Sequence, residues 1–171
     1  MPKLCRIVTH HKSPELAARL WEKLGLAAVG WASVGDTRRM SDEEIERTLM
    51  RVRNKTRQQA RSCRIQLRRF ESLRKGDTIL AYQKRNIVSL VGTVIERPSF
   101  NIGNEIGDPR GAIGYPHQVS VKWDPHPKRF HRTNLGRPLS DWVALQGTII
   151  CRNSIEDLDL DGISDGAGPR S

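Results

Sequence analysis

The stretch between Arg51 and Lys75 constrains this chain most, because it combines a high positive charge with the periodicity of a folded helix. It holds ten Lys or Arg residues and one acid, which is +9 of the formal net charge of +10. Small or apolar residues recur there at spacings of four and three, as in a helix with one buried face. They are Thr56, Ala60, Cys63, Leu67 and Phe70. We therefore predict a packed helix and not a disordered basic tail.

Five arginines form a second stripe on this helix, roughly a quarter turn from the first. They are Arg53, Arg57, Arg61, Arg64 and Arg68. Like charges four residues apart repel by a few tenths of a kcal/mol per pair, so the stripe costs stability unless a polyanion relieves it. Guanidinium groups also bind phosphate oxygens in pairs. We expect this stripe to bind nucleic-acid phosphates, together with Lys84 and Arg85 in a later turn; a solvated helix face is the alternative.

The composition favours one globular, polar domain. The chain has 171 residues, of which 37% are hydrophobic and 28% are charged. That length suits a single core better than two. No apolar run approaches the roughly 18 residues of a membrane span, and no apolar segment follows the N-terminus. We expect a soluble, cytoplasmic protein with no membrane partner.

The cysteines favour the same compartment. Cys5, Cys63 and Cys151 are odd in number, far apart and without a CxxC spacing. This pattern argues against both a disulfide framework and a zinc site, and it is typical of a reducing cytosol. We expect no metal and no other cofactor.

Alternation, capping residues and turn residues divide the rest of the chain. Strands are predicted at 4–9, 27–31, 77–83, 87–96, 117–123 and 147–151. Helices are predicted from Pro14 to Leu24, closed by Gly25, from a capping box at Ser41 and Glu44, and as a turn at 139–145. Residues 97–116 are predicted to be a functional loop, and 154–171 a flexible acidic tail after one domain over 1–153.

Several short blocks occur in an order that carries a resemblance. The blocks are Gly30-Trp31, a helical insert ending in Phe70, Lys75-Gly76-Asp77-x-Ile79, Val91-Gly92-x-Val94, Tyr115-x-His117 and Val121-Lys122-Trp123. This order resembles the EVE-like and YTH-like members of the PUA-like superfamily, over roughly Leu4 to Ile155. The resemblance implies an α+β fold, with a small twisted β-barrel of about five to six strands flanked by helices. It also implies an aromatic pocket that accepts a modified base.

In that family an aromatic residue in the position of Trp31 lines the pocket; a core tryptophan is the alternative. The other candidates for the pocket are Tyr82, Gln83, Phe100, Tyr115 and Trp123. Gln83 offers an amide to a base edge. Phe100 and Tyr115 are equally compatible with pocket walls and with loop anchors, and a core position is the stronger alternative for Trp123.

No nucleophile elbow, P-loop or pair of catalytic carboxylates occurs in the sequence, so we expect a binding module and not an enzyme. For the five histidines, structural or phosphate-facing roles are expected. The expected function is reading a modified, methylated base in duplex DNA by base flipping, as the specificity module of a modification-dependent restriction system. A nuclease or AAA+ motor would be its partner or a fused domain. A methylated-RNA-binding module and a metal-dependent nuclease are the alternatives.

Overall fold

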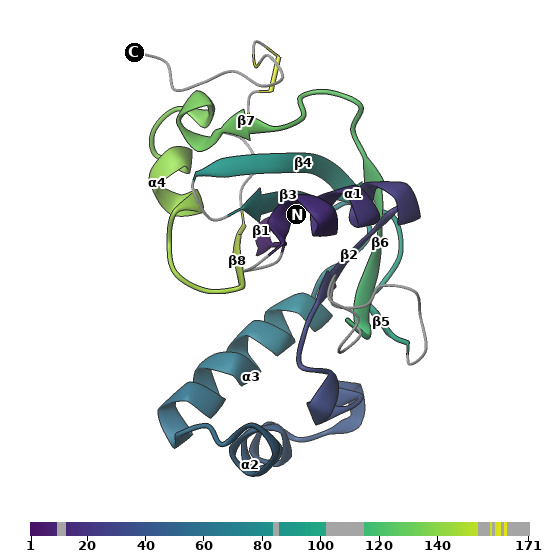
Figure 1. The fold of residues 1–171 in the computed structure, drawn as a ribbon, viewed down its shortest axis with the longest axis vertical. Coiled ribbons are helices and arrows are strands. Elements are labelled where there is room, and N and C mark those ends of the chain that lie inside the picture. The colour runs from purple at the N-terminus through teal and green to yellow at the C-terminus, as the bar shows by residue number, and fades with distance from the viewer. Residues whose placement is uncertain are drawn as a thin grey trace.

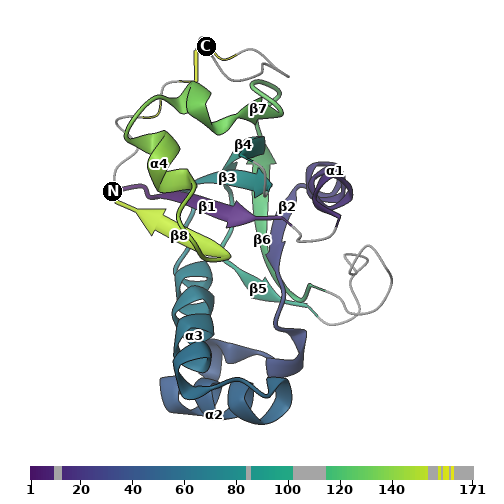
Figure 2. The same ribbon diagram turned by 60° about the vertical axis from the view of Figure 1, so that its left-hand side comes forward.

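A computed structural model describes residues 1–9, 13–83, 86–101 and 115–153, together with Leu158, Leu160, Asp161 and Ile163. It shows an α+β fold with two parts (Figure 1). A mixed sheet curls into a half-barrel and carries helices α1 (Pro14–Leu24) and α4 (Leu139–Val143); we call this part the sheet body. Residues 32–71 project from it as a helical lobe (Figure 2). The α+β class and the curled, barrel-like sheet agree with the prediction.

The sheet has eight strands within the described residues. They are β1 (Leu4–Val8), β2 (Leu26–Val29), β3 (Thr78–Gln83), β4 (Ile87–Val94), β5 (Ser99–Phe100), β6 (His117–Trp123), β7 (Phe130–His131) and β8 (Ile149–Arg152). The order is β2-β6-β4-β3-β1-β8, with β5 paired to β6 and β7 to β4. Only β1 and β3 run parallel among these pairs. The six predicted strands are confirmed with small differences at their ends; β5 and β7 are too short to show alternation.

Local sequence explains where the helices begin and end. The lobe contains two short 3-10 helices, η1 (Ala32–Val34) and η2 (Thr37–Arg39), and the helices α2 (Asp42–Arg53) and α3 (Arg57–Glu71). Ser41 and Glu44 form the predicted capping box of α2. Asn54, in the left-handed conformation, ends α2. Gly25 closes α1 at a φ of 64°. A further 3-10 helix, η3 (Arg132–Leu135), precedes α4.

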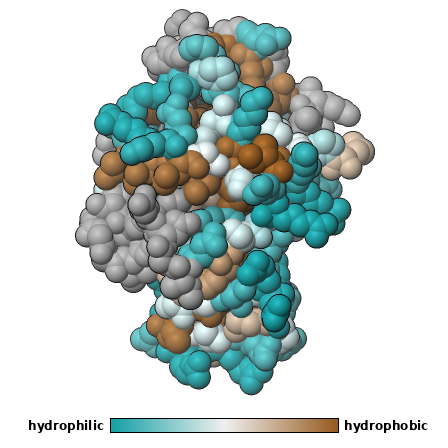
Figure 3. Space-filling model, turned by 90° about the vertical axis from the view of Figure 1, so that its right-hand side faces the viewer, coloured by the Kyte–Doolittle hydropathy of each residue, from teal (hydrophilic) through white to brown (hydrophobic). Residues whose placement is uncertain are grey.

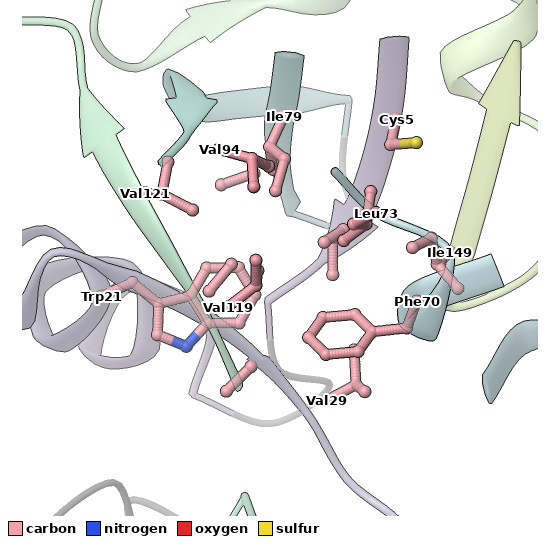
Figure 4. Close-up of a cluster of buried hydrophobic side chains, with 14 of the residues drawn as sticks. Cys5, Trp21, Val29, Phe70, Leu73, Ile79, Val94, Val119, Val121 and Ile149 are labelled. Atoms are coloured by element: carbon pink, nitrogen blue, oxygen red, sulfur yellow. The ribbon is translucent and has the colours of Figure 1, made fainter. Parts of the chain in front are cut away.

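Two apolar clusters lie on the two faces of the sheet. In the first, Trp21 of α1 and Phe70 of α3 pack with inward residues of the strands, among them Ile79, Val119 and Val121 (Figure 4). This confirms the core position of Trp21. It also confirms most of the predicted buried face of the basic helix, where Ala60, Leu67 and Phe70 are buried, but Thr56 is instead the exposed N-cap of α3. The second cluster, which includes Leu80, Val88 and Phe130, is covered by α4. Leu158, Leu160 and Ile163, which belong to the segment predicted to be a flexible acidic tail, also pack against it.

The prediction that the cysteines form no disulfide is wrong. Cys5 and Cys151 form a disulfide across 146 residues of sequence. The reason is topological: β1 pairs with β8 in antiparallel register, and this register places the two cysteines directly opposite each other. Sequence spacing alone does not reveal such a pair. Cys63 carries a free thiol.

In the parts of the chain that the structure describes, no helix combines the length and the apolar composition that a bilayer crossing requires.

Candidate functional site

Three of the predicted pocket residues come together around the first residue of β6. His117 of β6 faces Val29 of β2 on one side and Phe100 of β5 on the other. The Phe100 ring lies edge-on to the imidazole, with 5.0 Å between the ring centroids. Trp31 follows β2 and Tyr115 precedes β6, so the same strand pairing carries both to this place. The side chains of Trp31, Phe100 and Tyr115 are all partly exposed, and we call them the aromatic cluster.

The Gly30-Trp31 pair has a physical explanation at this site. A Cβ atom at Gly30 would lie 3.4 Å from Cε1 of Tyr115, so the tyrosine ring packs directly against the glycine backbone. Trp31 adopts a φ of 66°, a left-handed conformation that bulky residues rarely take. Its carbonyl accepts the Val34 amide at 3.0 Å and begins η1. Backbone strain of this kind costs about 1–3 kcal/mol and tends to occur at functional sites.

His117 is the polar centre of the aromatic cluster. It is 3% exposed, and among the described residues no group forms a hydrogen bond with its buried Nε2. Burial lowers the pKa of His117, against the opposing attraction of Glu71 and Asp36. The Trp31 backbone is also among the groups that raise the pKa of the His117 ring. The lowered pKa favours the neutral imidazole at pH 7.

The two carboxylates near His117 have partners of their own. Asp36 accepts hydrogen bonds from Nε and Nη2 of Arg38 at 2.8 and 2.6 Å, and these lower the pKa of Asp36 to about 2. Glu71 accepts from the hydroxyl of the buried Thr37 and, at 2.7 Å, from Arg68. The site therefore borders a paired charge network and not an isolated negative charge.

Two arginines of the predicted phosphate-binding stripe belong to that network. Arg64 donates to Asp42 at 2.6 Å and to Glu46 at 2.8 Å. Arg68 donates to Asp42 at 2.9 Å, to Glu71, and to two backbone carbonyls of the lobe. These bonds fasten α3 to α2 and η2. The expectation that only a polyanion relieves the stripe is wrong for Arg64 and Arg68, because the acids on α2 face them.

Arg53, Arg57 and Arg61 are different, because all three are exposed. They form no ion pair with any residue that the structure describes. They lie where α2 ends and α3 begins, at the end of the lobe away from the sheet (Figure 1). The face of the lobe seen in Figure 3 is mostly hydrophilic. Lys84 and Arg85, which we also predicted to bind phosphate, lie outside the described residues.

The other predicted pocket residues do not join the aromatic cluster. Tyr82 is buried in the second apolar cluster, where the Arg6 guanidinium lies 5.3 Å from its ring centroid. Trp123 stacks on Trp21 in the core at 6.5 Å between ring centroids and donates to the Trp21 carbonyl. The alternative reading of Trp123 as a core residue is therefore the one that fits.

Gln83 lies in a separate place. It is buried and lines a pocket of about 310 Å³ between α1 and the sheet. Glu15 and Glu22 of α1 form ion pairs with Arg129 and Lys128 at this pocket. The pocket has mixed charge and no aromatic side chain in its lining. It does not resemble the aromatic site that we predicted around Gln83.

Sequence reasoning missed His117 as a site residue and treated it only as part of a family block. Its alternation with Val119 and Val121 places it on the inward face of the strand, which was the available signal. Within the described residues, no group of three or more His, Cys, Asp or Glu side chains could hold a metal ion. The site thus consists of aromatic faces and one buried imidazole.

Comparison with known proteins gives a family but no activity. No curated protein matches the chain. The model of a family described as a domain of unknown function, DUF8426, matches residues 11–139. This match covers more than half of the chain and includes the whole aromatic cluster, the helical lobe and the sheet from β2 to β7. The chain therefore belongs to the DUF8426 family.

Proposed function

We propose that this protein is a nucleic-acid reader that binds a modified base, flipped out of duplex DNA, at the aromatic cluster. One observation carries the proposal. Strand pairing places three partly exposed aromatic residues, far apart in sequence, close to the buried His117, whose Nε2 has no hydrogen-bond partner among the described residues. Aromatic faces in such an arrangement suit the binding of a planar, uncharged ring.

The energies are consistent with this role. Extruding a base from a duplex costs a few kcal/mol. Stacking on aromatic side chains returns roughly 1–3 kcal/mol per base. An added methyl group enclosed by the rings contributes a further ~0.8 kcal/mol of binding free energy through burial. Trp31 is the residue best placed to stack, because its strained backbone fixes the side chain at the junction of the sheet body and the lobe.

The exposed arginines supply the second half of the proposal. Arg53, Arg57 and Arg61 would contact phosphates, which give affinity without sequence information. Base identity would then come from the aromatic cluster alone. The net charge of +10 supports a polyanionic partner.

We also propose a PUA-like fold of the EVE/YTH type, which would place the base pocket at Trp31. The protein would act in the cytoplasm without catalysis of its own, as the specificity module of a modification-dependent restriction system. A nuclease or AAA+ motor would then supply the cleavage or the movement along DNA.

Binding and melting measured on one mutant test the proposal. Trp31→Ala should lose roughly 1–3 kcal/mol of affinity for a duplex with a methylated base and retain weak binding to unmodified DNA. Trp142→Ala is the matched control, because Trp142 is also partly buried but lies in α4 against the second cluster. Its affinity for both duplexes should stay unchanged.

The panel should contain matched duplexes and single strands, DNA and RNA, with and without each common methyl mark, at a fixed salt concentration. A preference for methylated RNA would replace DNA as the ligand. If Trp31→Ala instead lowers the melting temperature strongly, and both affinities fall together, Trp31 is a core residue and the pocket assignment fails.

A further inference from the structure

We infer that the disulfide between Cys5 and Cys151 is a redox switch, which a small thiol opens and which sets how firmly the helical lobe is docked on the sheet body. The disulfide joins β1 to β8, the last strand that the structure describes. β8 in turn contacts α3, the long helix of the lobe. The switch does not depend on what the lobe binds.

The position of β8 in the sheet allows it to separate alone. β8 has four residues and lies at the end of the strand order, with β1 as its one strand neighbour among the described residues. It could therefore leave β1 without breaking another strand pair. A second tie holds the segment before it, because the Arg6 guanidinium donates to the carbonyls of Leu145 and Gly147. This tie would keep β8 close to β1 after reduction, so that the two thiols can pair again.

Three contacts transmit the state of β8 to the second half of α3. The Thr148 amide donates to the side-chain oxygen of Gln66. The Arg69 guanidinium donates to the Ile149 carbonyl at 3.4 Å. The side chain of Ile149 lies beside Phe70 in the first apolar cluster (Figure 4). Separation of β8 from β1 would weaken all three contacts, and with them the docking of α3.

The two cysteines differ in their access to solvent. Cys5 is fully buried, whereas Cys151 is partly exposed, so an attacking thiolate meets Cys151 first. A glutathione thiolate forms a mixed disulfide with Sγ of Cys151 and releases Cys5 as a thiolate, which takes up a proton. A second glutathione thiolate attacks the glutathione sulfur and releases the Cys151 thiolate, which is also protonated. The protein gains two electrons and two protons, and glutathione disulfide is the oxidised product.

The chemical setting favours a switch over a permanent cross-link. Disulfides with an exposed partner are reduced more readily than buried ones, and they are often regulatory. In a reducing cytoplasm, the location that we propose above, disulfides are usually transient and redox-sensing. The state of β8 would thus follow the ratio of glutathione to glutathione disulfide.

Hydrogen exchange of the full chain, measured by mass spectrometry without DNA, tests the switch. The protein is equilibrated at increasing ratios of glutathione to glutathione disulfide, and its thiols are counted by alkylation. Reduction should accelerate exchange roughly tenfold or more in both β8 and residues 66–71, and leave α1 and β6 unchanged. The double variant Cys5→Ser, Cys151→Ser should exchange fast at every ratio. Cys63→Ser, which removes the free thiol, is the matched control and should behave as wild type.

Three outcomes would overturn the switch. The first is a disulfide that stays oxidised in the folded protein at the highest ratio of glutathione. The second is fast exchange in β8 alone, since β8 would then not hold α3. The third is equal acceleration across the sheet, because the disulfide would then stabilise the whole fold. The wild-type titration needs no variant, so misfolding of the double variant would not remove the test. Because DNA is absent, each result is independent of the proposed function.

Discussion

The sheet body and the helical lobe are stabilised by different forces. The body has two apolar clusters, each built from strands and at least one helix. The lobe has one small cluster, centred on Ile45, Leu49 and Leu67, and depends in addition on the ion pairs of Arg64 and Arg68. Burial of apolar surface is only weakly affected by pH and modest salt, whereas partly exposed ion pairs are sensitive to both.

The basic helix α3 both stabilises the lobe and presents exposed positive charge. The arginines of α3 that face α2 and η2 are engaged by acids of the lobe, and those at the far end are left exposed. Electrostatic repulsion within the stripe is thus relieved at one end and retained at the other. Trp31 packs against both the first apolar cluster and the cluster of the lobe, so the aromatic cluster lies where the two parts meet.

The largest expected effect comes from removing the side chain that joins the two parts. Phe70 ends the basic helix but is 1% exposed within the first cluster of the body. Phe70→Ala should reduce the free energy of unfolding by about 3–5 kcal/mol, measured by urea titration, because it leaves a cavity in a packed core. Val52→Ala is the control on an exposed face of the lobe. It should change the free energy of unfolding by less than about 0.5 kcal/mol. A small effect of Phe70→Ala would mean that lobe and body are held together by other contacts.

The second prediction separates the exposed arginines from the paired ones. Changing Arg53, Arg57 and Arg61 together to Glu should flatten the slope of log affinity for duplex DNA against log salt by roughly two to three units. Arg68→Met should lower the melting temperature, because it leaves Glu71 without its guanidinium partner and removes one of the two guanidinium groups that bind Asp42. It should leave the salt slope unchanged. If Arg68→Met flattened the salt slope and the triple Glu variant did not, the DNA would contact the paired side of α3 and not the end of the lobe.

The smallest expected effect concerns acid sensitivity of the lobe. The pKa of Asp36 is lowered to about 2 by Arg38, so the pair stabilises the fold above pH 4 or so and is lost as the pH falls toward 2. Asp36→Asn should be less stable than wild type by under about 1 kcal/mol at pH 6, since the pair is largely exposed. The difference should vanish near pH 2 in urea titrations. Arg38→Met should give the same profile, and a pH-independent difference would show that the pair does not act through its charge.

Local sequence was sufficient for most elements of the fold. The capping box at Ser41 and Glu44, the left-handed Gly25 and the alternation of β6 each act within a few residues, so they can be recognised without knowing what they contact. The contacts between distant segments could not be predicted in this way. Cys5 meets Cys151, and Arg64 meets Asp42, only because of strand order and helix packing.

The candidate site was predictable in part for the same reason. Trp31, Phe100 and Tyr115 were expected at a pocket, and strand pairing brings them together around His117. Tyr82 points to the other face of the sheet because side chains alternate along β3. Alternation along β6 predicts that His117 points inward, but which of its ring atoms lacks a partner depends on neighbours that only the folded chain brings into place.

The pairing of the first strand with the last has a consequence for how the chain may be rearranged. Leu4 of β1 lies opposite Arg152 of β8, so the first and last described strands are neighbours at one side of the sheet. A short linker could therefore join these two points, and new termini could be opened at the exposed Asn54 between α2 and α3. Such a circular permutant would keep every strand neighbour of the sheet while cutting the lobe in two. Its folding would reveal whether the sheet body forms without a continuous lobe.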